Sequence, residues 1–432
     1  MNRQILAIAV PSVITNITVP LLGLVDVAIV GHMGDASYIA AISVGSMLFN
    51  VIYWIFGFLR MGTSGKTSQA YGRRDLPDTM HQLRQSLLTA LAVALSFLIG
   101  QYVVREVALW LMNTPAETRP LVTTYFNICI WGAPAMLSLY ALTGWFIGMQ
   151  NTRIPMVVAI MQNVVNILAS LTLVIGFGMK IEGVAVGTLV AQWTGLLVAV
   201  GLWFRYYRRL RKYIPGNKSR IFRQSPLPEQ SSHVNRDIFL RTLCLVAVNF
   251  FFTSVGAKQG SVVLAVNTLL MTFFTLFSYV MDGFAYAGEA LGGKFYGAGN
   301  VVALRRVTRL LFVWGGAMVV LYTFVYAVLG ADFLSLLTDD TTVRRAATGY
   351  YFWTLVIPVA GVAAFIYDGL FIGMTATRGM LLSCFLSAVL FFAVFYLLFP
   401  VLGNHALWMA YCLFLFMRGV IQYLYLLRSS FF

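Results

Sequence analysis

Charged residues are scarce in this chain of 432 residues: they make up 10% of it, against 59% hydrophobic residues. A soluble domain is usually about a quarter charged, so the composition excludes an ordinary soluble protein. In lipid every backbone N–H and C=O must be paired within the protein, which leaves only helices and closed barrels. Most apolar runs exceed about 18 residues, the length of a spanning helix, and the alternating pattern of barrel strands is missing. We therefore predict an all-α membrane protein.

Acidic residues, cysteines and histidines are also few. The 15 Asp and Glu stand against 30 Lys and Arg, but membrane proteins gather basic residues in cytoplasmic loops, so we expect no nucleic-acid partner. The four cysteines lie inside apolar runs and the four histidines are scattered, so we expect neither a disulfide set nor a metal site. Gly62-Thr-Ser-Gly-Lys66-Thr has its glycines too close together for a phosphate-binding P-loop. We expect a protein without a cofactor that is not an enzyme.

Hydropathy predicts twelve spans. They lie at 5–31, 38–63, 84–111, 121–148, 154–178, 183–205, 238–258, 262–290, 304–329, 347–373, 379–401 and 405–427. The first span lacks an A-x-A cleavage site, so we interpret it as a helix and not as a removable signal peptide. The segment 206–237 is rich in Arg, Pro, Ser and Gln, and predicts a cytoplasmic linker between an N-terminal lobe, 1–205, and a C-terminal lobe, 238–432.

The distribution of Lys and Arg predicts the orientation. If the N-terminus is cytoplasmic, 23 of the 30 basic residues lie on the cytoplasmic side and six on the opposite side. Arg60 remains, and it is the only basic residue that the sequence places clearly at membrane depth. Because cytoplasmic loops carry the excess of Lys and Arg, both termini are predicted to be cytoplasmic.

An internal repeat relates the two halves. The hexapeptide GWFIGM that starts at Gly144 recurs as GLFIGM at Gly369, and a Tyr-Gly pair at 71 recurs at 296, with the same offset along the sequence. Six spans per repeat give both halves the same orientation, which predicts a pseudo-two-fold axis along the membrane normal and a binding cavity between the lobes. Each hexapeptide also holds a G-x-x-x-G, which lets helix backbones approach closely.

Asp26 is the most informative polar residue. It lies about five residues inside the outer end of the first span, with no Lys or Arg within four residues. An ionised carboxylate at mid-bilayer costs at least about 2.5–3.5 kcal/mol, so the default explanation is function, and a reversible proton carrier is the function we predict. A structural hydrogen bond between helices is the alternative. Phe252 occupies the equivalent position of the second half, so the role would belong to the first lobe alone.

Other polar residues of the first lobe are candidates for the same site. Gln162, Asn166 and Ser170 follow an i, i+4, i+8 row on one face of the fifth span. With Asn163 beside this row and Thr188 on the sixth span, they would form a hydrogen-bonded cluster around the acid. Structural hydrogen bonds between helices explain these residues about as well.

Two prolines interrupt the first span. Pro11 and Pro20 each remove a backbone donor, so the helix bends there, either as a moving hinge or as a static kink.

The second lobe carries a less decisive set. Asp282, Tyr286 and Glu289 share one face of the eighth span, and Asp368 lies on the tenth. Asp282, Tyr286 and Asp368 either line a cavity or make structural contacts. Glu289 is near Lys294 and the predicted cytoplasmic end, which favours an interfacial ion pair.

The segments PLLGLVDVAIVGH, FLRMGTSGKTSQAYG, NRDIFLRTL, MDGFAYAGEALGGKFYG, DGLFIGMTATRGM and LGNHALW occur in this order and resemble the multidrug and toxic compound extrusion (MATE) family, most of all its DNA-damage-inducible F (DinF) branch. The resemblance implies two six-helix lobes around a V-shaped cavity, and antiport of drugs against protons or sodium. It implies coupling and substrate roles for Asp26, Asn166 and Thr188. Many members have a second aspartate where this chain has Ser170, and some have a carboxylate where it has Asn249; both departures favour protons over sodium as the coupling ion.

The resulting hypothesis is a proton-coupled exporter in the cytoplasmic membrane of a bacterium, working as a monomer. Its partners would be organic cations or amphipathic drugs and the lipid bilayer. The alternative is a flippase or exporter of lipids or lipid-linked saccharides, which favours a strongly cationic cavity; Arg60 alone does not supply one. An integral-membrane enzyme would need a His or acid cluster at the interface, and a channel a ring of equivalent polar positions. The sequence contains neither.

Overall fold

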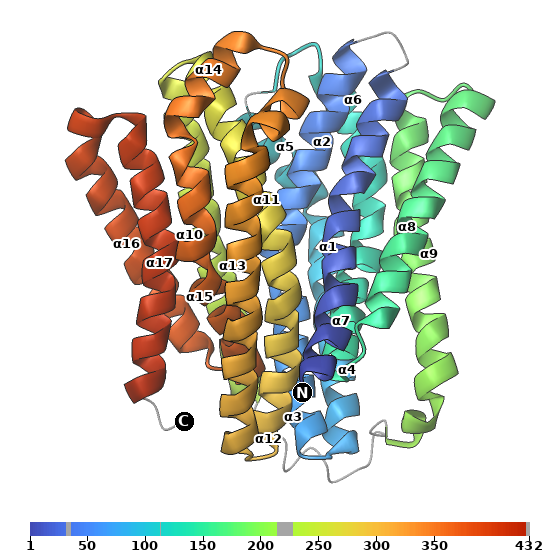
Figure 1. The fold of residues 1–432 in the computed structure, drawn as a ribbon. Coiled ribbons are helices and arrows are strands. Elements are labelled where there is room, and N and C mark those ends of the chain that lie inside the picture. Colours follow the sequence, from blue (N-terminus) through green and yellow to red (C-terminus); the bar gives the residue numbers. More distant parts are fainter. Residues whose placement is uncertain (32–35, 113, 214–227, 429–432) are drawn as a thin grey trace. The chain divides into compact units, whose positions relative to one another are not determined.

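The structure, a computed structural model, describes residues 1–31, 36–112, 114–213 and 228–428. Within these ranges the regular structure is entirely helical, as predicted (Figure 1). Of the predicted linker 206–237, residues 214–227 lie outside the described part, as do several side chains of the first helix.

The first half of the chain contains nine described α-helices. They are α1 Asn2–Gly31, α2 Ala36–Ile55, α3 Phe58–Gly72, α4 Leu76–Ile99, α5 Gln101–Leu111, α6 Arg119–Cys129, α7 Ala133–Gly148, α8 Arg153–Leu171 and α9 Ile181–Tyr207.

The second half contains eight described α-helices. They are α10 Pro228–Lys258, α11 Ser261–Ala287, α12 Gly293–Gly297, α13 Val301–Leu337, α14 Thr341–Tyr350, α15 Phe352–Gly373, α16 Thr377–Leu402 and α17 Asn404–Arg428. A π-helical turn, η5 Gly288–Gly292, joins α11 to α12.

Eleven helical segments in the described part are long and apolar enough to cross a membrane. Helix α1 is a twelfth such segment. It has 30 residues and a length of about 45 Å, which exceeds the ~30 Å thickness of the hydrocarbon core. Together they match the twelve predicted spans. Several helices are longer than the predicted spans. Helix α3 continues to Gly72, beyond the predicted end at 63, and α13 continues to Leu337, beyond the predicted end at 329.

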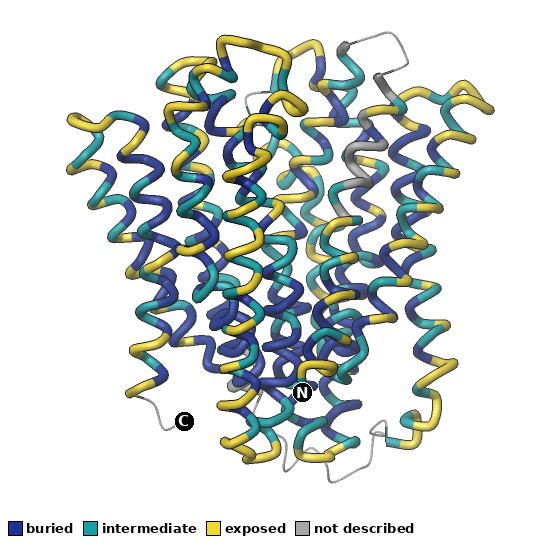
Figure 2. Tube along the Cα trace, in the orientation of Figure 1, coloured by how far each residue is buried: buried dark blue, intermediate teal, exposed yellow. Residues whose placement is uncertain are grey.

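Large apolar side chains are exposed along whole helices. On α13, Val313, Val320 and Phe324 are 61%, 71% and 65% exposed, and Figure 2 shows exposed positions recurring along this helix. Soluble proteins rarely expose contiguous apolar surface of this extent. The face is covered by lipid, and the chain is a multi-pass membrane protein.

The contacts divide the chain into two compact units, one of Met1–Val13 with Pro228–Phe432 and one of Ile14–Leu227. The predicted lobes, 1–205 and 238–432, differ from these units at the start of the chain, because the first turns of α1 pack with the second half. A glycine makes this packing possible: a Cβ on Gly283 of α11 would stand 2.9 Å from the carbonyl oxygen of Ala9.

The repeat recurs in the packing of the two units. Gly144 of α7 lies directly against the carbonyl of Arg60 on α3, and Gly369 of α15 lies directly against the carbonyl of Ala285 on α11. Gly369 and Ala285 lie at the same sequence offset from Gly144 and Arg60, so the two pairs are equivalent in the repeat. The close backbone approach predicted for the repeated hexapeptides is therefore confirmed.

The next turn repeats the same contact. A Cβ on Gly148 would stand 2.9 Å from the carbonyl oxygen of Ser64, and one on Gly373 would stand 2.5 Å from that of Glu289. These pairs are related by the same offset in the sequence. Each G-x-x-x-G is thus a packing seam between the second and fourth spans of its half.

Candidate functional site

The first polar cluster surrounds Asp26 in the second part of α1. Its side chain is 2% exposed, and the hydroxyl of Thr188 on α9 donates to Oδ2 at 3.4 Å. Asn166 of α8 donates from Nδ2 to the Thr188 hydroxyl at 3.1 Å. The structure therefore brings together three of the predicted residues in one chain of donors that ends on the carboxyl group.

The carboxyl group is only weakly satisfied. The hydrogen bond from Thr188 to Oδ2 is longer than the usual distance of about 2.7–2.8 Å between two oxygens. Within the described residues, Asp26 Oδ1 has no hydrogen-bond partner and no Lys or Arg forms an ion pair with Asp26. Two acceptors of the same region, Asn166 Oδ1 and Ser170 Oγ, also have none in the described part. A buried carboxylate in this condition lacks a counter-charge, which a proton or another cation would supply.

The predicted polar row of α8 faces α9. Ser170 lies directly against Gly187, and a Cβ on Gly195 would stand 2.5 Å from the side chain of Gln162. The two glycines, two turns apart, open space on α9 for the polar side chains of α8. Gln162 itself is not placed at the acid: its amide donates to the sulfur of Met136 at 3.8 Å.

Asn163 has a different role from the one predicted. Its amide donates to the backbone carbonyl of Thr18 on α1 at 2.9 Å. It therefore ties α8 to the helix that carries the acid, and its predicted part in the cluster around the carboxyl group stays a prediction. Pro20 lies just beyond this contact, and Pro11 is buried near the start of the same helix. Both prolines lie within a continuous helix, and the moving hinge stays a prediction.

An aromatic wall beside Asp26 is missing from the sequence prediction. Tyr125 and Cys129 of α6 lie within electrostatic range of the Asp26 carboxyl group, and Tyr125 is 3% exposed. Its ring lies edge-on to Phe49 of α2, with 6.3 Å between the centroids. Nothing in the sequence distinguishes this tyrosine from the others of the chain, because its position depends on how α6 packs.

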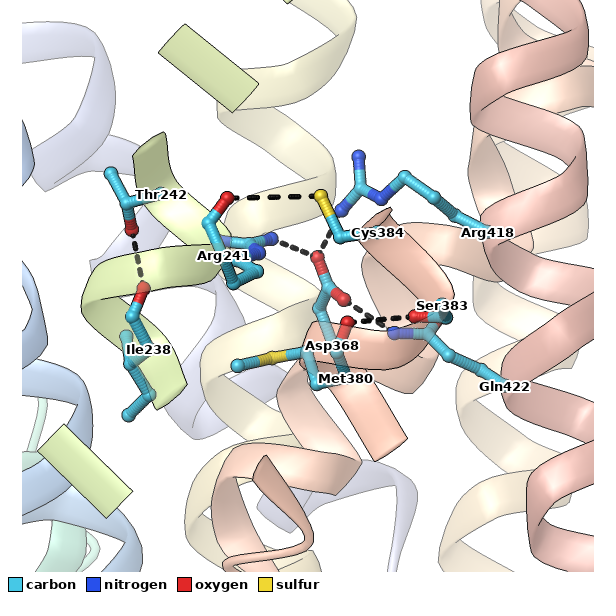
Figure 3. A network of polar contacts seen from close by, with 9 residues as sticks. All are labelled: Ile238, Arg241, Thr242, Asp368, Met380, Ser383, Cys384, Arg418 and Gln422. Carbon is cyan, nitrogen blue, oxygen red and sulfur yellow. Dashed lines mark hydrogen bonds and ion pairs between the residues drawn. The ribbon is translucent and has the colours of Figure 1, made fainter. Parts of the chain in front are cut away.

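The second polar cluster surrounds Asp368 of α15, and Figure 3 shows the side chains of Arg241, Arg418 and Gln422 directed toward it. Arg241 of α10 and Arg418 of α17 both donate to Asp368 Oδ2. Gln422, one turn beyond Arg418, donates from Nε2 to Oδ1 at 2.6 Å. Asp368 is thus the ionised centre of a buried network.

The two arginines correct the sequence interpretation. The orientation prediction counts Arg241 and Arg418 among the basic residues of the cytoplasmic side. In the structure both are buried, with 7% and 6% of their surface exposed. Arg241 lies in the first turn of the predicted span 238–258, and because α10 begins at Pro228, it lies several turns inside the helix. Arg60 is therefore not the only buried basic residue of the described part, and a shortage of such residues does not exclude a carrier of lipid-linked anions. The remaining cytoplasmic residues still outnumber the six on the opposite side, which leaves the orientation prediction unchanged.

The other second-lobe candidates lie on α11 and η5. Asp282 and Tyr286 are half-buried and one turn apart, and their cavity-lining role stays a prediction. Glu289 is 1% exposed, and its expected ion pair with Lys294 stays a prediction. It lies in the π-helical turn whose backbone packs against Gly373. No group of three His, Cys, Asp or Glu residues gathers as a metal site in the part of the chain that the structure describes.

Comparisons with known proteins agree with this arrangement. The MatE family matches residues 11–172 and 238–398. The chain is 35% identical to the DNA damage-inducible protein F of Escherichia coli strain K12, over 97% of this chain and 90% of that protein. It is 19% identical to the multidrug export protein MepA of Staphylococcus saprophyticus, over 91% of this chain and 86% of that one.

The fold has close counterparts among solved structures. A crystal structure of MATE in the bent conformation superposes with a TM-score of 0.87 at 18% identity, covering 98% of this chain and 94% of that one. The resemblance to the DinF branch is confirmed by the identity to the Escherichia coli protein. With its two repeated halves matched by one family over most of their length, the chain belongs to the MatE family of membrane transporters.

Proposed function

We propose that this transporter exports cationic or amphipathic toxic compounds in exchange for protons, and that Asp26 carries the coupling. Relatives named for multidrug export support the substrate class. The observation that carries the coupling is the state of Asp26: a carboxyl group 2% exposed, without a cationic partner among the described residues and with a long hydrogen bond from Thr188.

The cycle follows from the charge of this group. In its ionised form Asp26 attracts the cationic substrate or the donors around it. A proton that binds Oδ1 removes the negative charge and turns that oxygen from an acceptor into a donor. The acceptors Asn166 Oδ1 and Ser170 Oγ of the same cluster then become candidate partners, so protonation replaces a cation contact by internal hydrogen bonds.

Coupling requires that the proton bind one conformation better than the other. A tenfold difference in proton affinity corresponds to about 1.36 kcal/mol, comparable to gaining one internal hydrogen bond. The excess of basic residues at the predicted cytoplasmic side supports an orientation with both termini inside. Protons from outside would then reach Asp26 while the substrate leaves.

The test is transport of a fluorescent organic cation by proteoliposomes, driven either by an imposed pH gradient or by an imposed sodium gradient. We expect the pH gradient alone to drive the wild type, and Asp26→Asn to abolish that transport while the protein still inserts and folds. Asp332→Asn is the matched control, since Asp332 is an exposed acid of α13. Proton-driven transport that survives in Asp26→Asn would refute the proposed coupling, and transport driven by sodium alone would refute the choice of ion.

A further inference from the structure

A cavity of about 320 Å³ opens in the unit that contains Pro228–Phe432, and its lining includes no member of the Asp368 network. Three helices line it: α13 supplies two arginines and a threonine, α15 a tyrosine, and α17 a tyrosine and two leucines. The residues that decide its chemistry are Arg305, Arg309, Tyr367, Tyr423, Leu426 and Leu427.

The polar chemistry of this cavity selects an anion. Arg305 and Arg309 are one turn apart on the same face of α13, both are exposed, and neither forms an ion pair within the described residues. No acidic side chain of the described part lines the cavity. Two guanidinium groups at this spacing present forked donors that match the oxygens of a phosphate.

The cavity lies where the helices end. It joins the first turns of α13 to the last turns of α17, so its arginines stand at the edge of the apolar part of the molecule. Leu427 is 64% exposed and Tyr423 is 50% exposed, on a chain whose exposed apolar residues contact lipid. Basic pockets between transmembrane helices at this level bind phospholipid headgroups.

We propose that the cavity is a binding site for an anionic phospholipid, with the phosphate on Arg305 and Arg309 and an acyl chain along Leu427. A lipid fits better than a soluble anion because much of the lining is apolar or aromatic and faces the bilayer. The rings of Tyr367 and Tyr423 stack with 6.4 Å between their centroids and form the wall opposite the arginines.

The position of the site gives the lipid a structural effect. Tyr367 precedes Asp368 in α15, and Tyr423 follows Gln422 in α17. A headgroup that bridges α13 to these two tyrosines therefore links α13 to α15 and α17, two of the helices that supply the buried Asp368 network. Bound lipid stabilises the unit that contains this network.

The test is thermal unfolding of the purified full-length protein in detergent, with added phosphatidylglycerol or phosphatidylcholine. We expect phosphatidylglycerol to raise the unfolding temperature by about 4 °C, a shift of the size that occupancy of one ligand site gives a large chain. Phosphatidylcholine should have little effect. The double variant Arg305→Gln/Arg309→Gln should lose most of the shift while keeping the lipid-free unfolding temperature.

Arg306→Gln is the matched control, because Arg306 is exposed on the same helical turn but does not line the cavity. It should retain the full shift. Inorganic phosphate in a third arm distinguishes a headgroup from a free anion. An equal shift in the double variant, an equal shift with phosphatidylcholine, or the whole shift with inorganic phosphate would each overturn the proposal. None of these readouts depends on transport.

Discussion

Gly369 lies so close to the backbone carbonyl of Ala285 that no β-carbon fits between α15 and α11. The carbonyl belongs to a helix backbone and has no rotamer by which to move away. Since Gly144 and Arg60 make the same contact at the equivalent positions of the first half, the seam is a property of the repeat and not of one lobe.

The first prediction concerns this seam. Gly369→Ala should lower the free energy of unfolding by about 1–3 kcal/mol, the cost of overpacking a tight contact. Gly316→Ala is the control, because a β-carbon there meets nothing within 4 Å and alanine favours the helix by up to about 1 kcal/mol. The two variants are compared by their unfolding temperatures in detergent. Equal unfolding temperatures would contradict a tight contact between Gly369 and the Ala285 carbonyl.

The second prediction concerns the Asp368 network. Asp368→Asn leaves two buried guanidinium groups without an anion, which should cost about 3–5 kcal/mol. Arg418→Gln leaves Asp368 paired one to one with Arg241, so its cost should be clearly smaller.

The double variant Asp368→Asn/Arg418→Gln sharpens this comparison. Removing one of the two uncompensated charges should recover part of the stability lost in Asp368→Asn, a coupling that a thermal unfolding cycle measures. A double variant less stable than Asp368→Asn would show that the charges are not the cause.

The third prediction concerns the donor to Asp26. Thr188→Val keeps the shape of the side chain and removes the hydroxyl, whereas Thr188→Ser keeps the hydroxyl. Because a hydrogen bond of this kind contributes about 1 kcal/mol, Thr188→Val should slow pH-driven transport roughly fivefold. Thr188→Ser should remain near the wild-type rate. Initial transport rates in proteoliposomes distinguish the two variants. Equal rates for Thr188→Val and Thr188→Ser would show that the hydroxyl has no part in the mechanism.

The fourth prediction concerns Ser170, which is fully buried against Gly187. Ser170→Asp supplies the second carboxylate expected of a sodium site, but the packing leaves no room for it. We expect Ser170→Asp to lower the unfolding temperature equally in sodium chloride and choline chloride, and Ser170→Ala to be nearly neutral. A Ser170→Asp variant that sodium stabilises would show that one substitution restores a sodium site.

Hydropathy and the repeat predict most of the fold, because both follow from local sequence. Span length depends on apolar runs, and the glycine seam depends on a hexapeptide that is visible twice. The helix ends are less predictable: α3 and α10 extend through polar residues, which lipid headgroups and water tolerate. Arg241 lies in the first turn of its predicted span, and a count of basic residues cannot show that it pairs with Asp368 of another helix.

The first polar cluster is more predictable than the second. Asp26 stands alone in an apolar run, and the spacing on α8 identifies Asn166. The partners of Asp368 are distributed over α10 and α17, far apart in sequence, and the repeat does not reveal them because the first half has no equivalent acid. The roles of Asn163 and Tyr125 depend on which helix each one faces, and periodicity within one helix does not contain that information.

The packing of Ala9 against Gly283 has a consequence for biosynthesis. The first turns of α1 leave the ribosome long before their partner on α11, because helices α2 to α10 lie between them in the sequence. Domains generally assemble as they emerge, but the start of this helix must wait in the membrane until α11 has been made. A transporter truncated before α11 would therefore present an unpaired leading segment to lipid or to a chaperone.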